Sequence, residues 1–321
     1  MKTALRIGLV LYAIGSFISA ALGGSYPPGT VRIVVGFGPA SAADTVARLV
    51  AKQLEDKLGK TVIVENRPGN SSMIAAELVA RAPNDGLTLF MATVANTLYP
   101  AHTKDGFDLS QKLQPIALLG AVPNVLVVDA SVPVRSVSEL IALAKKDPSA
   151  LTFATSGQWT ASFMAAELFN MKAGTKIVSV PYQGGSNQVL TDLLTGRIKL
   201  TFNVAGTLAP YVSSGKLIAL AVGQPKRTAI MPDVPTMDEA GLPGIDVGTW
   251  IGLMAPRGTS QEIIDALARA SSEAMQQQSV KDALKAQGID PLSSTPQEFA
   301  EFIQKDIQKW RALVESLGLK E

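Results

Sequence analysis

The sequence predicts an α/β fold of two lobes, each a mostly parallel sheet flanked by helices. Strand-like and helix-like segments alternate along the 321 residues, the order typical of parallel sheets. They form two series of similar length, followed by a tail of helices that can fold back onto the first series. We therefore expect the chain to pass between the lobes twice, near residues 124 and 249.

The first series has the order βαβαβ. Val31 begins a β-branched strand, and apolar residues then recur every three or four positions until Gly59, which predicts an amphipathic helix. A turn at 83–86 precedes the third strand. The expected strands lie at 31–36, 61–65 and 87–92, and the expected helices at 44–58 and 72–82.

The second series follows a long apolar stretch at 118–128. Ser136 and Glu139 have the spacing of a capping box, which predicts a helix that ends near Lys146. The expected strands lie at 151–154, 177–180, 199–202 and 217–222, and the expected helices begin near Thr160, Gly185 and Thr207.

The C-terminal part begins with a segment rich in Pro and Gly, 225–248. A strand at 250–254 and three helices are expected after it, the first and last opened by capping boxes at Thr259 and Thr295. We expect lobe 1 to comprise 24–123 and 249–321 and lobe 2 to comprise 124–248, with a ligand cleft between the lobes.

The N-terminus has the three-part layout of a secretory signal. Lys2 and Arg6 precede an apolar run of 16 residues, 7–22, which is short for a membrane span, and small residues end the segment. We expect a signal peptide at 1–23 and a periplasmic mature protein, with an N-terminal anchor helix as the alternative. The chain has no Cys, so disulfides, thiolate metal sites and a lipid attachment site are excluded.

Charge and residue types exclude several functions. The chain has 29 Lys and Arg against 27 Asp and Glu, and the loss of Lys2 and Arg6 leaves a neutral mature form without the basic patch of a nucleic-acid binder. His102 is the only His, so neither a metal cage nor a Ser-His relay is easily assembled. The nearest match to a nucleophile elbow, at 184–188, lacks the last Gly. We therefore expect no metal and no hydrolase chemistry.

The loop after the first strand is one candidate anion site. Its G-x-G-x-x-S pattern at 36–41 precedes a helix, and Glu65 is placed to bind a ribose, as in NAD-dependent oxidoreductases. However, Pro39 lacks an N–H for a phosphate, Ser41 stands where Gly or Ala is usual, and Asp44 puts a negative charge in the first helical turn. These departures favour a different anion, and the dinucleotide site is the alternative.

A hydroxyl-rich turn in the second series is the other candidate anion site. It lies between a strand and a helix, and the hydroxyls of Ser156 and Thr160 together with first-turn N–H groups can bind an anion without a cation. Ser41, Ser156 and Thr160 could also be ordinary N-caps. Two such turns at equivalent points of two lobes favour a shared interlobe site.

An ordered series of short motifs extends over nearly the whole mature sequence. The motifs are YP with VRIVV at 26–35, VENRPG at 64–69, DGLTL at 85–89, VPNVLVV at 122–128, VPYxG at 180–184, TDLLxG at 191–196, DVPT at 233–236 and EAGLPG at 239–244. In these motifs the chain resembles the Bug family, the periplasmic solute receptors of tripartite tricarboxylate transporters. The resemblance implies a type II periplasmic binding protein fold, whose two lobes close around a small carboxylate.

The resemblance also implies which residues bind the ligand. The first binding loop of the family corresponds to Pro39, Ala40, Ser41 and Asp44, the second to Ser156, Gly157, Trp159 and Thr160, and Tyr182, Gln183, Gly184 and Asn203 complete the cleft. A ligand that bridges Ser41 to Ser156, Thr160 and Tyr182 would close the lobes for recognition by the membrane subunits of the transporter. The resemblance implies a monomeric receptor without a cofactor, and not an enzyme.

Both loops depart from the usual family pattern. Ala40 and Ser41 replace two glycines of the first loop, Trp159 replaces a Gly of the second, and Asn203 replaces a frequent Asp. These changes remove charge and add aromatic surface, which predicts a carboxylate with an aromatic or otherwise apolar body in place of a C4-dicarboxylate or amino acid. Trp159 and Phe163 could instead pack against their own helix, because they are four residues apart.

Overall fold

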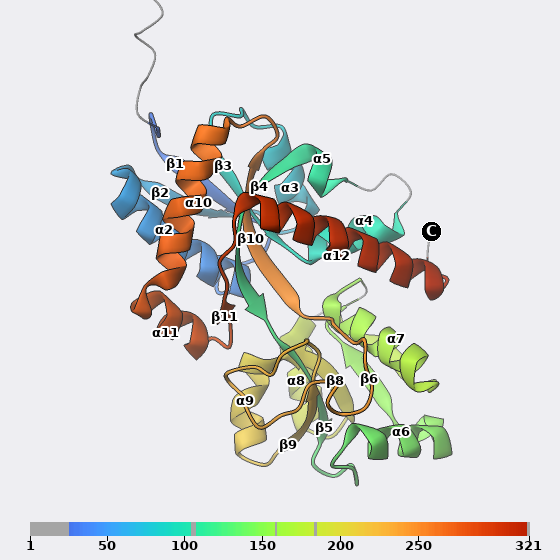
Figure 1. The fold of residues 1–321 in the computed structure, drawn as a ribbon. Coiled ribbons are helices and arrows are strands. Elements are labelled where there is room, and N and C mark those ends of the chain that lie inside the picture. Colours follow the sequence, from blue (N-terminus) through green and yellow to red (C-terminus); the bar gives the residue numbers. More distant parts are fainter. Residues whose placement is uncertain (1–25, 104–106, 158, 183–184, 320–321) are drawn as a thin grey trace, which may run out of the picture.

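The fold consists of two β-sheets, each with helices on both faces (Figure 1). The structure, a computed structural model, describes residues 26–103, 107–157, 159–182 and 185–319, and the expected signal peptide at 1–23 lies outside them. We refer to the first sheet with its helices as lobe 1 and to the second sheet with its helices as lobe 2. The α/β class expected from the sequence is confirmed.

Lobe 1 contains a sheet with the strand order β11-β4-β10-β3-β1-β2. Its strands are β1 (Val31–Val35), β2 (Val62–Asn66), β3 (Thr88–Thr93), β4 (Leu113–Val122), β10 (Thr249–Pro256) and β11 (Asp290–Pro291). Its helices are α2 (Ala42–Leu58), α3 (Met73–Ala80), α4 (Ala95–His102), α5 (Leu109–Lys112), α10 (Gln261–Gln276), α11 (Gln278–Ala286) and α12 (Pro296–Ser316).

Lobe 2 contains a sheet with the strand order β7-β6-β8-β5-β9. Its strands are β5 (Asn124–Asp129), β6 (Thr152–Thr155), β7 (Val178–Pro181), β8 (Leu200–Val204) and β9 (Leu217–Val222). Its helices are α6 (Val137–Lys146), α7 (Ala161–Ala173), α8 (Gly185–Leu194) and α9 (Ala205–Ser213).

Most strands of each sheet run in one direction, as expected, although the sheets are mixed. In lobe 1, β1 is parallel to β2 and β3, while β10 is antiparallel to both β3 and β4. In lobe 2, β6 is parallel to β7 and β8, while β5 is antiparallel to β8 and β9. The strands β5 and β10 run against their neighbours because each carries the chain in from the other lobe.

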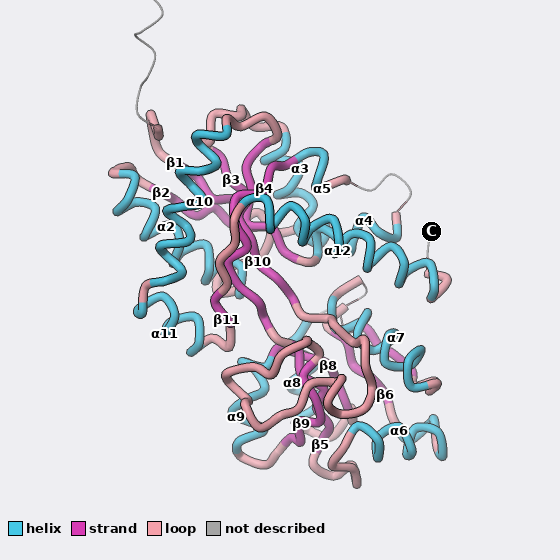
Figure 2. The backbone as a smooth tube through the Cα atoms, in the orientation of Figure 1, coloured by secondary structure: helices cyan, strands magenta, loops and turns pink. Residues whose placement is uncertain are grey.

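The chain passes between the lobes on extended strands (Figure 2). Only Pro123 separates β4 from β5, and the return path enters lobe 1 on β10, which pairs with β4 from Thr249 to Pro256. Side chains alternate along β10 because it is a strand. Thr249 and Ile251 line the space between the lobes, and Trp250 contacts α12 through its indole N–H.

Apolar side chains on alternate strand positions explain the layers. Val31, Ile33 and Val35 of β1 pack in one core with α2, α10 and α11, whereas Val34 packs in another with α3, α4 and α12. The second core continues into lobe 2 beneath α6 and α7. A third core in lobe 2 lies beneath α8 and α9. In the described part of the chain, no helix has both the length and the apolar character needed to cross a bilayer.

The predicted element ends are corrected in several places by local hydrogen bonds. The helix expected to begin at Asp44 begins at Ala42, since Ser41 is its N-cap. Ser260, not Thr259, caps α10, because the Thr259 hydroxyl donates to the Pro256 carbonyl. The capping box at Thr295 is confirmed. Helices α4 and α5 were not expected from the sequence pattern.

The lobes also touch away from the crossing strands, at the turn between α11 and β11. A Cβ placed on Gly206 of α9 would lie 2.4 Å from the Gln287 carbonyl oxygen and 3.1 Å from the Cα of Gly288. The backbones approach this closely because both positions lack a side chain. Next to them, the N–H of Ala229 in lobe 2 donates a hydrogen bond to the carboxyl of Asp290 in lobe 1.

A buried carboxylate joins three elements of lobe 1. Asp306 of α12 is 3% exposed, and its Oδ2 accepts hydrogen bonds from Thr97 Oγ1 at 2.6 Å, Trp250 Nε1 at 2.8 Å and Trp310 Nε1 at 3.0 Å. Lys309 Nζ lies 2.9 Å from its Oδ1. The carboxylate thereby connects α12 to α4 and to β10.

We expect Asp306→Ala to lower the free energy of unfolding by about 3 kcal/mol, because it leaves two buried indole N–H groups without an acceptor. Urea unfolding followed by circular dichroism measures the change. Glu301→Ala, on the exposed side of the same helix, should change the free energy by less than about 0.5 kcal/mol. Equal effects of the two substitutions would contradict a stabilising role for the buried carboxylate.

Candidate functional site

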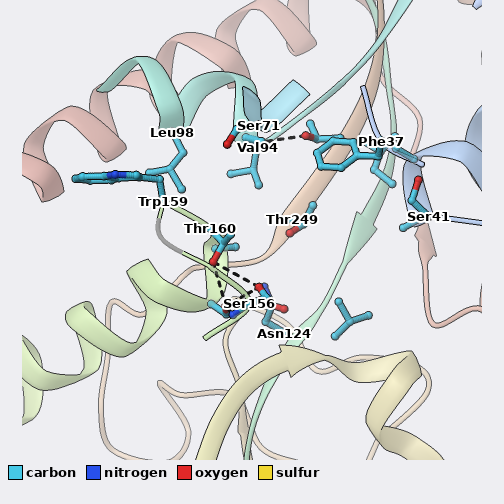
Figure 3. A pocket seen from close by; sticks show the side chains of 18 of the residues that line it. Phe37, Ser41, Ser71, Val94, Leu98, Asn124, Ser156, Trp159, Thr160 and Thr249 are labelled. Atoms are coloured by element: carbon cyan, nitrogen blue, oxygen red, sulfur yellow. Dashed lines mark hydrogen bonds between the residues drawn. The ribbon is translucent and has the colours of Figure 1, made fainter. Parts of the chain in front are cut away.

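A cavity of about 330 Å³ lies between the lobes, next to the residues that follow β1, β3, β6 and β8 (Figure 3). Ligands of open α/β folds bind at such places, because loops and helix N-termini converge outside the carboxyl ends of the strands. The lining residues come from both lobes. Lobe 1 contributes Phe37, Ser41, Ala42, Ala43, Ser71, Thr93, Val94, Ala95, Leu98, Thr249 and Ile251, and lobe 2 contributes Asn124, Ser156, Trp159, Thr160, Ala161, Ser162, Asn203 and Val204.

The described lining is uncharged: it contains no Asp, Glu, Lys, Arg or His. Its polar side chains are hydroxyls and amides, and the remainder are aliphatic or aromatic. Nowhere in the described chain do three or more His, Cys, Asp or Glu side chains come together to hold a metal ion. The site can therefore bind through neutral donors and apolar contact.

Five of the residues expected from the sequence line this cavity. They are Ser41, Ser156, Trp159, Thr160 and Asn203. Gln183 and Gly184 lie outside the described residues. The other expected residues, Pro39, Ala40, Asp44, Gly157 and Tyr182, are not among the lining residues.

The first loop is held by the N-terminus of α2. Ser41 caps the helix, and its Oγ accepts a hydrogen bond from the N–H of Asp44 at 3.2 Å. Ala40 has a φ of 62°, which is unfavourable for a residue with a side chain. Its N–H donates to Asp44 Oδ2 at 2.9 Å. Pro39 and Ala40 thus shape the loop but are not among the residues that line the cavity.

Asp44 does not line the cavity, because its carboxylate is enclosed by hydrogen-bond partners; its expected contact with the ligand stays a prediction. Its side chain is 2% exposed, and its carboxylate also accepts hydrogen bonds from Arg48 Nε and Asn66 Nδ2, each at 2.9 Å. The same Asn66 Nδ2 donates to the Phe37 carbonyl at 2.9 Å. This network fastens the loop at 37–41 to both α2 and β2.

The charge of Asp44 is stabilised within this network. Burial acts to raise the pKa of Asp44, but the hydrogen bonds from Arg48, Asn66 and the N–H of Ala40 outweigh burial and hold its pKa below the usual value. The hydrogen bond to Asp44 likewise raises the pKa of Arg48. Both groups stay ionised and paired with each other.

The second loop presents a cluster of hydroxyls before α7. Ser156 Oγ and Ser162 Oγ are 2.8 Å apart, and Thr160 Oγ1 lies 3.1 Å from Ser162 Oγ (Figure 3). Thr160 is the N-cap of α7, and the first turn of this helix contains no acidic residue. The N-terminus of a helix has N–H groups without intrahelical acceptors and a partial positive charge. Because Thr160 Oγ1 donates to the Gly157 carbonyl, the donors available to an anion are the first-turn N–H groups and the hydroxyl of Ser156 or Ser162.

Two buried amides complete the lobe 2 side. Asn124 donates through Nδ2 to the Val247 carbonyl at 2.8 Å. Asn203 is 2% exposed, and its Oδ1 accepts from the N–H of Val204 at 2.8 Å, but its buried Nδ2 has no hydrogen-bond partner. A buried donor without an acceptor is costly, so this amide is suited to a ligand oxygen.

Trp159 both lines the cavity and packs against Phe163, so the two roles considered for it are compatible. It lines the cavity, and its ring also packs edge-on against Phe163, with 6.1 Å between ring centroids and an interplanar angle of 62°. Its φ is 56°, a left-handed conformation in which the family's usual Gly is relaxed. The indole lies beside Leu98 of α4, so it closes one end of the cavity (Figure 3).

Tyr182 and Gly157 support the second loop but do not line the cavity. The Tyr182 hydroxyl donates to Asp192 Oδ2 at 2.9 Å. Burial, and then the hydrogen bond and charge of Asp192, raise the pKa of Tyr182. The Gly157 carbonyl accepts from Thr160 Oγ1 at 2.8 Å. The hydroxyl of Tyr182 is thus directed at α8, and its expected contact with the ligand stays a prediction.

Sequence reasoning missed the apolar wall that lobe 1 contributes. Phe37, Val94 and Leu98 line it, together with Thr249 and Ile251 of β10. One signal was present in the sequence. The expected strand at 87–92 ends next to Thr93 and Val94, and residues after a parallel strand reach the carboxyl edge of the sheet.

The glycine pattern at 36–41 has a packing explanation. A Cβ on Gly36 would lie 1.8 Å from Ser72 Oγ, so Gly36 allows the segment before α3 to approach β1. Glu65, the expected ribose ligand, pairs instead with Arg32 and Arg67. Two positions of this loop are unavailable to a pyrophosphate, since the N–H of Ala40 donates to Asp44 and Pro39 has no N–H.

Comparison with known proteins gives the family. The model described as "Tripartite tricarboxylate transporter family receptor" matches residues 46–319. The chain belongs to the tripartite tricarboxylate transporter receptor family. BugT of Bordetella pertussis is 33% identical, over 97% of this chain and 98% of BugT. The family expected from the sequence motifs is confirmed.

Solved structures agree with this tripartite tricarboxylate transporter receptor assignment. The periplasmic binding protein BugD is 28% identical with a TM-score of 0.78, over 92% of this chain and 99% of BugD. An R. palustris protein with adipate is 32% identical with a TM-score of 0.80, over 91% and 98% of the two chains. MatC from Rhodopseudomonas palustris with bound malate is 31% identical with a TM-score of 0.75, over 90% and 100%.

We expect Asp44→Asn to lower the melting temperature of this receptor at pH 7, because it removes the charge from the hydrogen bonds that hold the first loop. A carboxylate whose pKa is depressed by folding stabilises the protein above its unfolded pKa, about 3.9 for Asp, and this stabilisation is lost as the pH falls through the folded pKa. The difference from the wild type should therefore shrink below about pH 4. Thermal melts at pH 7 and pH 3 measure it.

The matched control is Asp56→Asn, an exposed position on the same helix, which should leave the melting temperature close to that of the wild type at both pH values. A difference for Asp44→Asn that is equally large at pH 7 and pH 3 would contradict an ionised Asp44.

Proposed function

We propose that this chain is a periplasmic solute receptor that captures a small carboxylate with an aromatic or otherwise apolar body. The observation that carries the proposal is the composition of the interlobe cavity. Hydroxyl and amide donors gather at the N-terminus of α7, and the rest of the wall is apolar and uncharged. A carboxylate matches such donors, because charged acceptors form the stronger hydrogen bonds.

The relatives support a carboxylate as the ligand class. Two solved structures about as similar to this chain as BugT were determined with adipate and with malate. The chain shares their fold along nearly its whole described length. The uncharged lining and Trp159 favour an apolar or aromatic body for the ligand of this chain.

The proposed mechanism is closure of two lobes around the ligand. Lobe 1 comprises 24–123 and 249–321, and lobe 2 comprises 124–248. The ligand is held by Ser156 and Thr160 in lobe 2 and contacts the wall near Ser41 in lobe 1. It favours the closed form by the additional binding free energy that it gains when both lobes contact it. The closed form is what the membrane subunits of the transporter recognise.

The proposal treats the protein as a receptor and not as an enzyme. In the described lining, no side chain can serve as a general acid, a general base or an activated nucleophile. The mature protein acts as a monomer in the periplasm, after removal of the signal peptide at 1–23. It needs no cofactor and binds no nucleic acid.

We expect benzoate and hexanoate to raise the melting temperature of the mature protein, and benzamide and methyl benzoate to have far smaller effects. Hydrogen bonds from neutral donors to a charged acceptor contribute roughly 1.5–3 kcal/mol, and the neutral analogues lose this gain. Affinity should also fall as the pH drops below the pKa of the ligand, about 4. A thermal-shift panel that includes glucose and inorganic phosphate measures the preference. Stabilisation by glucose without any response to a carboxylate would contradict the proposal.

We expect ligand binding to change the tryptophan fluorescence through Trp159, because Trp250 and Trp310 are buried in lobe 1 at 4% and 0% exposure. Trp159→Gly should abolish the change and weaken benzoate binding by about 1–3 kcal/mol, as for the loss of one stacking aromatic. Trp310→Phe is the control and should keep the ligand response. Unaltered affinity of Trp159→Gly would show that the indole only packs against Phe163.

A further inference from the structure

We infer that the ligand carries a single carboxylate, which lobe 2 binds at the N-terminus of α7, while lobe 1 accepts only the uncharged remainder of the molecule. The inference rests on the proposed function and narrows its ligand class from carboxylates to monocarboxylates. It depends on a difference between the two helix N-termini that face the cavity.

Residues 39–41, which precede α2 in lobe 1, have no N–H left for an anion. Pro39 has no N–H, the N–H of Ala40 donates to Asp44 Oδ2 at 2.9 Å, and the N–H of Ser41 donates to the Gly38 carbonyl at 3.3 Å. The Asp44 carboxylate lies within the first turn, where it compensates the partial positive charge of the helix. A carboxylate of the ligand would meet only the first-turn N–H groups of Ala42 and Ala43, beside an Asp44 charge that offsets the partial positive charge of the helix.

The only cation beside this loop is already used, as far as the described residues show. Arg48 donates to Asp44 through Nε at 2.9 Å and to Asn66 Oδ1 through Nη2 at 3.1 Å. Arg48 does not line the cavity. It therefore neutralises Asp44 and leaves no net positive charge for a ligand group in lobe 1.

The N-terminus of α7, in lobe 2, is open to an anion. Its first turn has no acidic residue, and its Ser and Thr hydroxyls lie in the cavity wall. The second observation is independent of the helix: Asn203 Nδ2 faces the same cavity, is fully buried and has no acceptor. A carboxylate oxygen placed here would satisfy that donor and meet the helix dipole together.

The wall opposite this anion site is unsuited to a second charge. Phe37, Val94 and Leu98 present aliphatic and aromatic surface there (Figure 3). Transferring an ionised carboxylate from water to such a surface without a cation or several donors is strongly unfavourable. The polar side chains that lobe 1 contributes to the lining are the hydroxyls of Ser41, Ser71, Thr93 and Thr249. Ser71 is the most exposed among them, and hydroxyls without a cation do not replace the hydration of a second carboxylate.

The experiment compares ligands that differ by one carboxylate. Isothermal titration calorimetry of the mature protein uses hexanoate against adipate and 4-methylbenzoate against terephthalate. We expect each monocarboxylate to bind at least tenfold more tightly than its dicarboxylate counterpart. Adipate, which accompanies the R. palustris relative, should thus be a poor ligand of this chain.

Two substitutions of one exposed lobe 1 residue test the cause. Ser71→Lys places a cation on the wall opposite α7 and should raise the affinity for adipate, reducing the preference for hexanoate by fivefold or more. Ser71→Met has a similar length without charge and should leave the preference for hexanoate unchanged. Asn203→Asp places a negative charge next to the proposed carboxylate site in lobe 2. It should lower the affinity for hexanoate and for 4-methylbenzoate at least tenfold, in a protein that still melts cooperatively.

The outcomes separate the two proposals. Dicarboxylates that bind as tightly as their monocarboxylate partners would overturn the inference and leave the carboxylate receptor intact. Suppose that Ser71→Lys and Ser71→Met change the preference for monocarboxylates equally. The lack of a positive charge in lobe 1 would then not be the cause of that preference. If no carboxylate binds, both the inference and the proposed function are wrong.

Discussion

The pairing of β10 with β3 and β4 is the interaction on which the rest of the structure depends. This strand returns from lobe 2 and enters the middle of the lobe 1 sheet, antiparallel to both neighbours. Its alternating side chains then serve two purposes. Thr249 and Ile251 form part of the cavity wall, and Trp250 donates to the Asp306 carboxylate that joins α12 and α4. The floor of the cavity and the anchoring of the C-terminal helix are thus set by one strand, and the register of β10 determines where each residue faces.

The two candidate binding loops have similar local structure but differ in charge. Each is a strand, a turn and a helix capped by a hydroxyl residue, Ser41 in lobe 1 and Thr160 in lobe 2. In lobe 1, Asp44 accepts a hydrogen bond from the N–H of Ala40 and fixes the loop, and its charge offsets the positive end of α2. In lobe 2, the hydroxyls bond to one another and an amide donor is left over. The lobe 1 loop is held in shape by the Asp44 carboxylate, and the same carboxylate makes this loop less suited to bind the carboxylate of a ligand.

Sequence patterns predicted the parts of this protein that depend on local rules. Most helices and strands, the capping box at Thr295 and the hydroxyl turns follow from spacing, and the ordered motifs identified the family. The motif resemblance placed Asp44 and Tyr182 at the ligand, whereas their side chains bond to Arg48 and Asp192. Direction of a side chain depends on tertiary partners such as Asn66, which is 22 residues from Asp44 in sequence. Phe37 and Leu98 were missed for the same reason, since only the approach of two lobes makes them neighbours of Thr160.

The contact between Gly206 and Gly288 has a mechanical consequence. Backbone touches backbone there, with no flexible side chain between the lobes to compress or rotate. A contact of this kind resists further approach but does not resist tilting, so it behaves as a pivot at one edge of the interlobe space. A side chain at either glycine would hold the two lobes apart at this edge, because the backbones already lie within contact distance.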